Sequence, residues 1–363
     1  RGALPCGARL NGERFNGVTN VDNRNGESKR SPSRRLVGWG LYAGYLAAVV
    51  FVGVKLFGYF VLDIPVTRSA NADDVWRYYY KELWKSGAVD SQSTAGDGRM
   101  DVLLLGASVL EQAADPLEDA LKKQVGDNVR VYNLCKSAHT TRDSALKYSR
   151  LREKQFDLIV VYHGINDSRM NCVPKADFRD DYSHCRWYAG FDRRLKAGML
   201  SVRGITAGFN RGKIALGEPD DDARAFGRDV KTETAFRRNV EQIVKAAAAR
   251  KTPVVLMTFA TWIPDGYSEE KFRMGKLPYG SGRFELPVEV WGDPPNVLKT
   301  VNAHNAVIRD IAGRYDNVRF VDQQKLLPGN GSVFSDVCHL TDDGCEQFAA
   351  NVVAAIRRTP QPP

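Results

Sequence analysis

Three short blocks of the chain contain residue types that together can carry out nucleophilic chemistry. Ser108 and Asn166 each follow an apolar, strand-like run, and Asp336 and His339 lie three residues apart near the C-terminus. A serine hydroxyl is a weak nucleophile, so it needs a base to take its proton and donors to stabilise the oxyanion that it creates. The set predicts attack on a carbonyl by Ser108, with His339 as the base and Asp336 orienting the imidazole.

Each block also has an ordinary structural interpretation. Serine is a favoured helix N-cap, so Ser108 in Gly-Ala-Ser could simply begin a helix. The turn Gly164–Asp167 is common after a strand, and Asp336 and His339 could lie in a surface loop with a capping Asp. The order of the blocks and their spread from residue 108 to residue 339 make the combination more specific than any single block.

The elements that must position these residues alternate from residue 100 onward. The expected strands are Met100–Leu105, Val129–Leu134, Leu158–Tyr162, Pro253–Phe259 and Val318–Val321. The expected helices are Leu110–Lys123, Arg142–Glu153, Thr232–Arg250, Val297–Tyr315 and Asp342–Arg357. Strands separated by single helices predict right-handed βαβ units and a parallel sheet covered on both faces. Ligands of such sheets bind outside the carboxyl ends of the strands, where the candidate residues fall.

Two long insertions interrupt this alternation, at residues 168–230 and 262–296. Loops of such length are often lids or substrate loops. The second insertion contains Trp262, Tyr267, Phe272, Tyr279, Phe284 and Trp291. These aromatic side chains could stack on sugar rings or line an acyl site, but we favour a small satellite core that holds the insertion down. The nearby basic residues, which could attract an anionic glycan or phospholipid or form a solvated face, are Lys271, Arg273, Lys276 and Arg283.

The combination of blocks resembles the SGNH (GDSL-type) serine hydrolase family over about residues 98–358. The stretch Ser335–Thr341 is similar to the family's Asp-x-x-His block, and Gly164–Asp167 is similar to its Gly-x-Asn-Asp block. The resemblance implies a flavodoxin-like three-layer α/β/α fold with a parallel sheet of about five strands. It also implies a serine esterase without a cofactor or metal, whose catalytic triad is Ser108, Asp336 and His339.

The resemblance further implies an oxyanion hole. Its donors would be the Ser108 and Ala138 backbone N–H groups and the side-chain amide of Asn166, with Gly164 and Asp167 in supporting roles. Two positions depart from the family pattern, since Ala107 stands where the family commonly has Asp and Ala138 stands where it has Gly. Ala138 can still donate its N–H if its backbone angles are allowed for a non-glycine residue. His139 and His163 border the same region, and we expect structural or substrate-contact roles for them.

The net charge of +9 is concentrated at the N-terminus. Residues 1–35 carry eight basic and three acidic residues, which leaves only +4 on the rest of the chain. This balance argues against a nucleic-acid partner. Residues 1–35 lack hydrophobic periodicity and predict a disordered, basic cytoplasmic tail. The chain begins with Arg1 rather than Met, which fits a fragment or a reading frame that opens upstream of the true initiator.

The 27-residue run Leu36–Leu62 contains Lys55 as its only charge and predicts a single transmembrane helix. Four basic residues stand immediately before it, so we expect the N-terminus in the cytoplasm and the rest of the chain outside the cytoplasmic membrane, in the periplasm of a Gram-negative cell. A cleaved signal peptide is the alternative, but the run exceeds the usual apolar region of such peptides. Residues 63–97 are expected to form a juxtamembrane helix at Asp73–Lys85 and a linker.

In an oxidising compartment two local cysteine pairs could form disulfides, Cys172 with Cys185 and Cys338 with Cys345, although unrelated thiols are an equal alternative. We therefore expect a membrane-anchored esterase with an ester-bearing substrate, and an O-acetylated cell-envelope or exported glycan is the first hypothesis. A glycan O-acyltransferase with the same triad is one alternative. A catalytically weak glycan-binding or scaffold domain, suggested by the two departures from the family pattern, is another.

Overall fold

The computed structural model of the protein describes residues 32–60, 72–90, 98–151, 153–197 and 221–357. The chain divides into two compact units, Arg1–Val66 and Thr67–Pro363. Residues 1–31 of the predicted cytoplasmic tail and residues 91–97 of the predicted linker lie outside the described residues.

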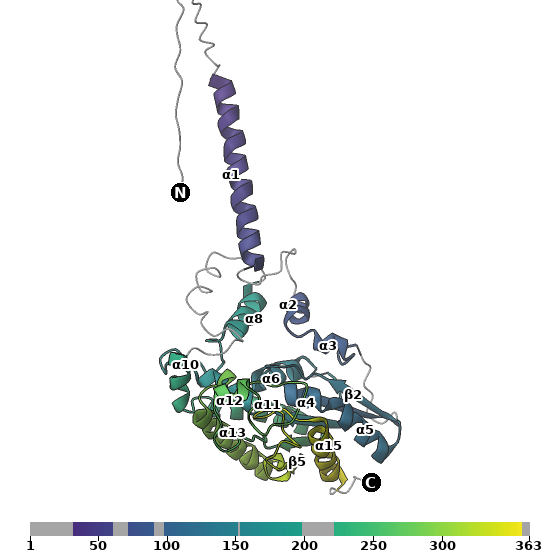
Figure 1. Ribbon diagram of the computed structural model, residues 1–363. Coiled ribbons are helices and arrows are strands. Elements are labelled where there is room, and N and C mark those ends of the chain that lie inside the picture. Colours follow the sequence, from purple (N-terminus) through teal and green to yellow (C-terminus); the bar gives the residue numbers. More distant parts are fainter. Residues whose placement is uncertain (1–31, 61–71, 91–97, 152, 198–220, 358–363) are drawn as a thin grey trace, which may run out of the picture. The chain divides into compact units, whose positions relative to one another are not determined.

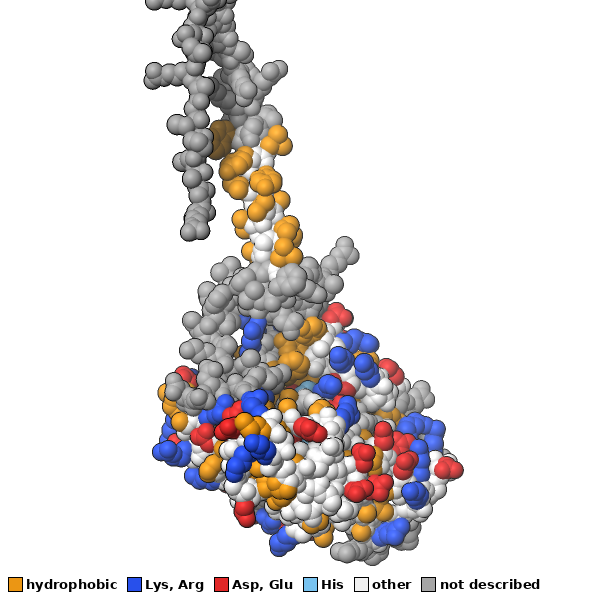
Figure 2. All heavy atoms as spheres, viewed as in Figure 1, with side chains coloured by type: hydrophobic (Ala, Val, Ile, Leu, Met, Phe, Trp, Pro, Cys, Tyr) orange, Lys and Arg blue, Asp and Glu red, His pale blue; other side chains and the backbone are white. Residues whose placement is uncertain are grey.

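The first unit contributes helix α1 (Pro32–Phe60), which covers most of the predicted transmembrane run. The window Trp39–Leu56 is long and apolar enough to cross a membrane, and none of it is buried within the structure. Figure 2 shows the described side chains of this helix as mainly hydrophobic. An uncleaved anchor and an N-terminal signal sequence both have these properties, so α1 establishes an apolar helix near the N-terminus but not its orientation.

The second unit is built on a five-stranded sheet in the order β2-β1-β3-β4-β5, with all neighbouring strands parallel. The strands are β1 (Met100–Gly106), β2 (Val129–Asn133), β3 (Leu158–Tyr162), β4 (Val254–Met257) and β5 (Val318–Val321). This strand order is that of flavodoxin-like folds. The prediction of a parallel sheet of about five strands is confirmed, with strand ends that differ by at most two residues.

Both faces of the sheet are covered because strand side chains alternate between two cores. In β1, Val102 and Leu104 belong to one hydrophobic cluster, whereas Leu103 and Leu105 belong to the other. Helices α5 (Ala114–Val125) and α15 (Asp342–Arg357) pack together on the first side. The helices of the second side are α6 (Thr141–Arg150), α11 (Glu233–Ala248) and α13 (Pro294–Arg314) (Figure 1). The result is the expected three-layer α/β/α arrangement.

The helix expected at Leu110–Lys123 is two helices, α4 (Ser108–Gln112) and α5, which meet at Ala113. Pro116 explains the break, because a proline lacks the N–H for the i−4 carbonyl and its ring clashes with that carbonyl, here the one of Gln112. The segment expected as one helix at Asp73–Lys85 is also two, α2 (Ala72–Tyr79) and α3 (Glu82–Lys85).

The described parts of the two insertions contain only short elements besides α8 (Arg186–Ala197). In the first these are α7 (Ile165–Ser168) at its start, η1 (Arg169–Asn171), α10 (Asp221–Ala225) and η2 (Phe226–Arg228). In the second they are α12 (Glu269–Arg273) and η3 (Val288–Val290), and α14 (Gln323–Leu326) follows β5. The satellite core that we expected is not separate, because Trp291 lies in the main cluster of the α5–α15 side and Trp262, Tyr267 and Tyr279 pack against it.

Candidate active site

Ser108 lies at the turn between β1 and α4, at the carboxyl end of β1. Gly106 ends the strand, and a Cβ there would lie 2.8 Å from Cβ of Leu110, so only glycine allows this tight approach. Ala107 has extended angles, φ −117° and ψ −154°, and Ser108 begins the helix. The Ser108 side chain is therefore presented at the first turn of α4, where backbone N–H groups have no intrahelical acceptors.

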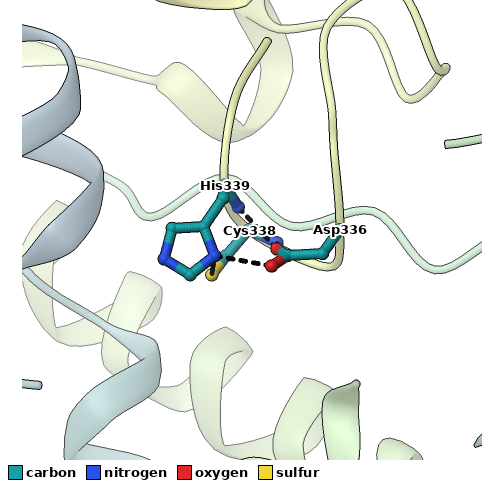
Figure 3. Close-up of side chains that lie close together, drawn as sticks. All are labelled: Asp336, Cys338 and His339. Carbon is teal, nitrogen blue, oxygen red and sulfur yellow. Dashed lines mark hydrogen bonds and ion pairs between the residues drawn. The ribbon is translucent and has the colours of Figure 1, made fainter. Parts of the chain in front are cut away.

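His339 joins Ser108 to Asp336. Its Nδ1 lies 2.6 Å from Asp336 Oδ2, and its Nε2 lies 2.8 Å from Ser108 Oγ. A carboxylate only accepts hydrogen bonds, so Nδ1 carries the proton and Nε2 is left to accept from the serine hydroxyl. Figure 3 shows that Asp336 and His339 project from one short loop with their polar atoms facing each other. The structure thus brings together the three residues that were expected to form a triad.

The Asp336 carboxylate is buried and accepts further hydrogen bonds from the backbone. Its Oδ1 accepts from the N–H groups of Cys338 at 2.9 Å and His339 at 2.7 Å, and its Oδ2 accepts from Leu286 N–H at 2.8 Å. These bonds fix the orientation of the carboxylate toward His339. Leu286 belongs to the second insertion, so this insertion helps to hold the carboxylate in place.

A side chain that the motifs did not indicate connects α4, which carries Ser108, to the loop that carries His339. Gln112 Nε2 donates to the Leu340 carbonyl at 2.5 Å, and its Oε1 accepts from Leu340 N–H at 3.2 Å. Gln112 lies one helical turn after Ser108, which is the only signal in the sequence that could have drawn attention to it.

Asn166 points its amide toward the same region from the start of α7. Its Nδ2 donates to the His139 carbonyl at 3.0 Å, and its Oδ1 accepts from Trp291 Nε1 at 2.8 Å. An amide nitrogen has two protons, so one of them remains for a ligand. A Cβ on Gly164 would lie 2.4 Å from Phe259, which explains the glycine at this position.

Ala138 lies in the β2–α6 loop (Leu134–Thr140) and has a positive φ of 67°. This left-handed conformation is unfavourable for a residue with a Cβ, and it occurs where the family pattern has glycine. Glu111 of α4 holds the adjacent residue, because its Oε2 accepts from Ser137 N–H at 2.8 Å and from Ser137 Oγ at 2.9 Å. The loop is therefore fixed to the helix that carries Ser108.

Asp167 is fully buried and braces the β2–α6 side of the site. It accepts from Thr141 N–H at 3.0 Å, from Thr141 Oγ1 at 2.6 Å and from the Tyr182 hydroxyl at 2.9 Å. Burial nevertheless raises the pKa of the Asp167 carboxyl to about 7. His163 donates to or accepts from Ser144 Oγ at 2.7 Å, and burial lowers its pKa to about 3, so it is a neutral structural histidine.

The two possible disulfides are not formed in the structure, which agrees with the alternative of unrelated thiols. The described cysteines all carry thiols, namely Cys135, Cys172, Cys185, Cys338 and Cys345. The Cys172 thiol faces the Trp291 carbonyl at 3.7 Å, whereas Cys185 lies in a different cluster with Met170 and Tyr182. Cys338 faces His339 Nδ1 at 3.8 Å, and Cys345 lies in the first turn of α15.

Among the described residues, one group of side chains has the spacing of metal ligands, and it is Asp336, Cys338 and His339 (Figure 3). Its carboxylate and imidazole are already hydrogen-bonded to each other, so a metal ion would have to break the contact that orients His339. Burial and the nearby Asp336 raise the pKa of the Cys338 thiol well above its usual value, which disfavours the thiolate that metals bind. The group suits a carboxylate–imidazole pair better than a metal site.

The sequence model of the GDSL-like lipase/acylhydrolase family matches residues 94–347. The chain belongs to this family. It is therefore a member of a family of esterase and acylhydrolase enzymes, as the resemblance to SGNH hydrolases predicted. The match includes all three candidate triad residues and begins after α2 and α3. A comparison with curated proteins gives no significant match.

Several solved structures of related folds are similar to the family domain at low sequence identity. A GDSL-like lipase from Bacteroides thetaiotaomicron has a TM-score of 0.42 and 15% identity, with 77% of this chain and 97% of that chain covered. An acetyl xylan esterase from Geobacillus stearothermophilus has a TM-score of 0.41 and 13% identity, covering 75% and 100%. The catalytic domain of a peptidoglycan O-acetyltransferase from Streptococcus pneumoniae has a TM-score of 0.35 and 11% identity, covering 72% and 93%.

Proposed function

We propose that the protein is a serine esterase in which Ser108 is the nucleophile, His339 the general base and Asp336 the residue that orients and stabilises the imidazolium. The observation that carries this proposal is the continuous chain of two hydrogen bonds, from Ser108 Oγ to His339 Nε2 and from His339 Nδ1 to Asp336. Nucleophile, base and orienting group within hydrogen-bond reach are the geometric signature of covalent catalysis by serine.

In the first half of the proposed reaction, His339 takes the hydroxyl proton as Ser108 Oγ attacks the ester carbonyl. The carbonyl oxygen becomes an oxyanion, which would be stabilised by the Asn166 amide and by the N–H groups of Ala138 and Ser108. The protonated His339 then gives its proton to the leaving alcohol, and an acyl-Ser108 remains. Water, deprotonated by His339, attacks this ester and releases the acid.

For the substrate we propose an O-acetylated glycan, either of the cell envelope or exported. The proposal is supported by the apolar helix α1 with the basic residues before it, which favour a membrane anchor and an extracytoplasmic domain. It is also supported by exposed cationic side chains close to the site. Arg283 and Lys136 both lie near Glu111, at 4.0 Å and 3.6 Å from its Oε1. Reporter fusions at Pro363 test the topology, and a reporter active only in the cytoplasm would exclude the extracytoplasmic arrangement.

Covalent labelling of the full-length chain in detergent with a fluorophosphonate probe tests the nucleophile. We expect the wild type to be labelled and Ser108→Ala and His339→Ala to lose labelling, together with at least about a thousandfold of their hydrolysis of a soluble acetyl ester. Ser149→Ala is the matched control, because Ser149 is an exposed serine on α6. Absence of labelling in a folded wild-type chain would favour a binding or scaffold role.

Assays of the same protein with and without a glycan acceptor distinguish hydrolysis from acyl transfer. An esterase consumes an O-acetylated oligosaccharide in water alone, since water resolves the acyl-enzyme. If turnover requires a second glycan with free hydroxyls and moves the acetyl group onto it, the reaction is acyl transfer and not hydrolysis.

A further inference from the structure

The helices α2 and α3 lie outside the family match yet form part of the hydrolase core. The match begins at residue 94, whereas Tyr80 and Leu83 are fully buried in the cluster that covers the second face of the sheet. The hydroxyl of Tyr80 donates to Asp143 Oδ1 at 2.9 Å, and Asp143 in turn caps α6 through the Thr140 backbone N–H at 2.7 Å. This segment therefore reaches the residues that follow Ala138 in the β2–α6 loop.

A fully buried ammonium group connects the same segment to both ends of that loop. Lys147 of α6 donates to the Leu134 carbonyl, lies 3.1 Å from His139 Nδ1 and forms an ion pair with Glu82 Oε1 at 3.3 Å. Leu134 and His139 flank the stretch that contains Ala138. A buried ammonium is tolerated only when it is paired, and Glu82 is the anion that pairs with it here.

His139 connects Lys147 to Asn166. Burial lowers the pKa of His139 to about 3, so its imidazole is neutral, and Nδ1 must accept because an ammonium only donates. Glu82 Oε1 also lies 3.6 Å from that nitrogen. The backbone carbonyl of His139 accepts the hydrogen bond from Asn166 Nδ2 at 3.0 Å. The position of His139 thus affects two of the proposed oxyanion donors, Ala138 beside it and Asn166 bonded to it.

We propose that Glu82 and Lys147 are positioning residues, which hold the β2–α6 loop so that Ala138 and Asn166 face the reacting carbonyl. The helices before the family domain then contribute to the active site through Glu82. The proposal rests on the proposed function, because it assigns a role in the same oxyanion hole. Ala138 gives the loop a particular need for support, since its left-handed backbone is unfavourable and must be maintained by its surroundings.

The test uses the full-length protein with Lys147→Met, Glu82→Gln and the double variant, in which both charges are removed. Asp73→Asn is the matched control. Asp73 of α2 forms an ion pair with Arg150 of α6, so this pair also joins the segment before the family match to α6, but at the surface, with the side chains 54% and 37% exposed. The substrate is p-nitrophenyl acetate, and rates are expressed per active site titrated with the fluorophosphonate probe.

We expect Lys147→Met and Glu82→Gln to lower kcat by about 10- to 100-fold with KM changed by less than about twofold, because oxyanion donors act mainly in the transition state. The double variant should recover thermal stability, since no unpaired charge stays buried, but should not recover kcat. Asp73→Asn should leave kcat unchanged. A purely structural role predicts lower Tm with normal kcat per titrated site, and that result would overturn the proposal.

Hydrogen exchange of the loop provides a readout that does not depend on activity. The amides of Ser137–Thr140 should exchange faster in Lys147→Met than in the wild type, and at the wild-type rate in Asp73→Asn. Unchanged exchange in Lys147→Met contradicts the proposal even if kcat falls. If the wild type hydrolyses no ester but its loop responds as expected, the proposed function fails while the positioning of the loop by Glu82 and Lys147 stands.

Discussion

At the level of single residues, the candidate site is held together by side chains that no sequence motif identifies. Trp291 donates to Asn166 from 125 positions away, and Gln112 bonds to Leu340 from 228 positions away. The meeting of Ser108, Asp336 and His339 could be predicted because Asp336 and His339 share one short motif and Ser108 follows a strand. The supporting contacts could not, because they depend on how distant loops meet after folding.

Ala138 illustrates the limit of prediction at this scale. The sequence shows alanine where the family pattern has glycine, but only the structure shows that the residue keeps the left-handed conformation with φ at 67°. Alanine therefore adopts at this position a backbone conformation that normally favours glycine. Glu111 and the buried Lys147 hold the two sides of the loop that contains it.

Substitutions of Ala138 should follow the cost of that conformation. Ala138→Gly removes strain of about 1 kcal/mol, offset in part by the greater entropy of glycine in the unfolded chain. We expect activity within about twofold of the wild type and an equal or slightly higher Tm. Ala138→Val puts a β-branched side chain into the left-handed region, and we expect about 2 kcal/mol or more of lost stability and a large loss of fluorophosphonate labelling. Equal labelling of the valine variant would show that the Ala138 backbone does not matter for the reaction.

At the level of elements, strand and helix types could be predicted more reliably than helix continuity. Strands β1, β3 and β4 were recognisable because their apolar runs are buried on both faces. Helix α15 begins and ends at the predicted residues. The break between α4 and α5 was missed, although Pro116 is its sequence signal. The second insertion was expected as a separate lid or satellite, but Trp291 and Leu286 make it a support of Asn166 and Asp336.

Replacing Trp291 by Phe tests this role of the insertion. The indole N–H is lost while the ring remains, so the buried Oδ1 of Asn166 loses its donor, which costs about 1–3 kcal/mol. The amide is then free to rotate, and kcat should fall by at least about tenfold. Trp262→Phe is the matched control, since this indole of the same insertion packs edge-to-face on Tyr279 rather than against the amide. A common loss of kcat in both variants would indicate general destabilisation of the insertion instead.

At the level of the whole molecule, the boundary of the folded unit does not coincide with the boundary of the family. The compact unit begins at Thr67, whereas the family match begins at residue 94. The aromatic segment between them could be predicted as helical from its spacing. Its burial could not be predicted, because the same aromatic bulk would suit a membrane surface, and only the fold shows that the segment packs on the α6–α11 side of the sheet.

Two shortened chains test where the functional unit begins. A chain that starts at Thr67 keeps α2 and α3 and should hydrolyse p-nitrophenyl acetate within about twofold of the full-length rate, since membrane attachment is not needed for a soluble ester.

A chain that starts at Asp90 loses the buried side chains Val75, Trp76, Tyr79, Tyr80 and Leu83. Each large core side chain contributes about 2–5 kcal/mol, so the five together contribute about 10–25 kcal/mol, which matches or exceeds the roughly 5–15 kcal/mol by which a domain is stable. The second chain should therefore show no cooperative thermal transition and no hydrolysis. Normal hydrolysis by it would place the catalytic unit wholly within the family match and would remove α2 and α3 from the active protein.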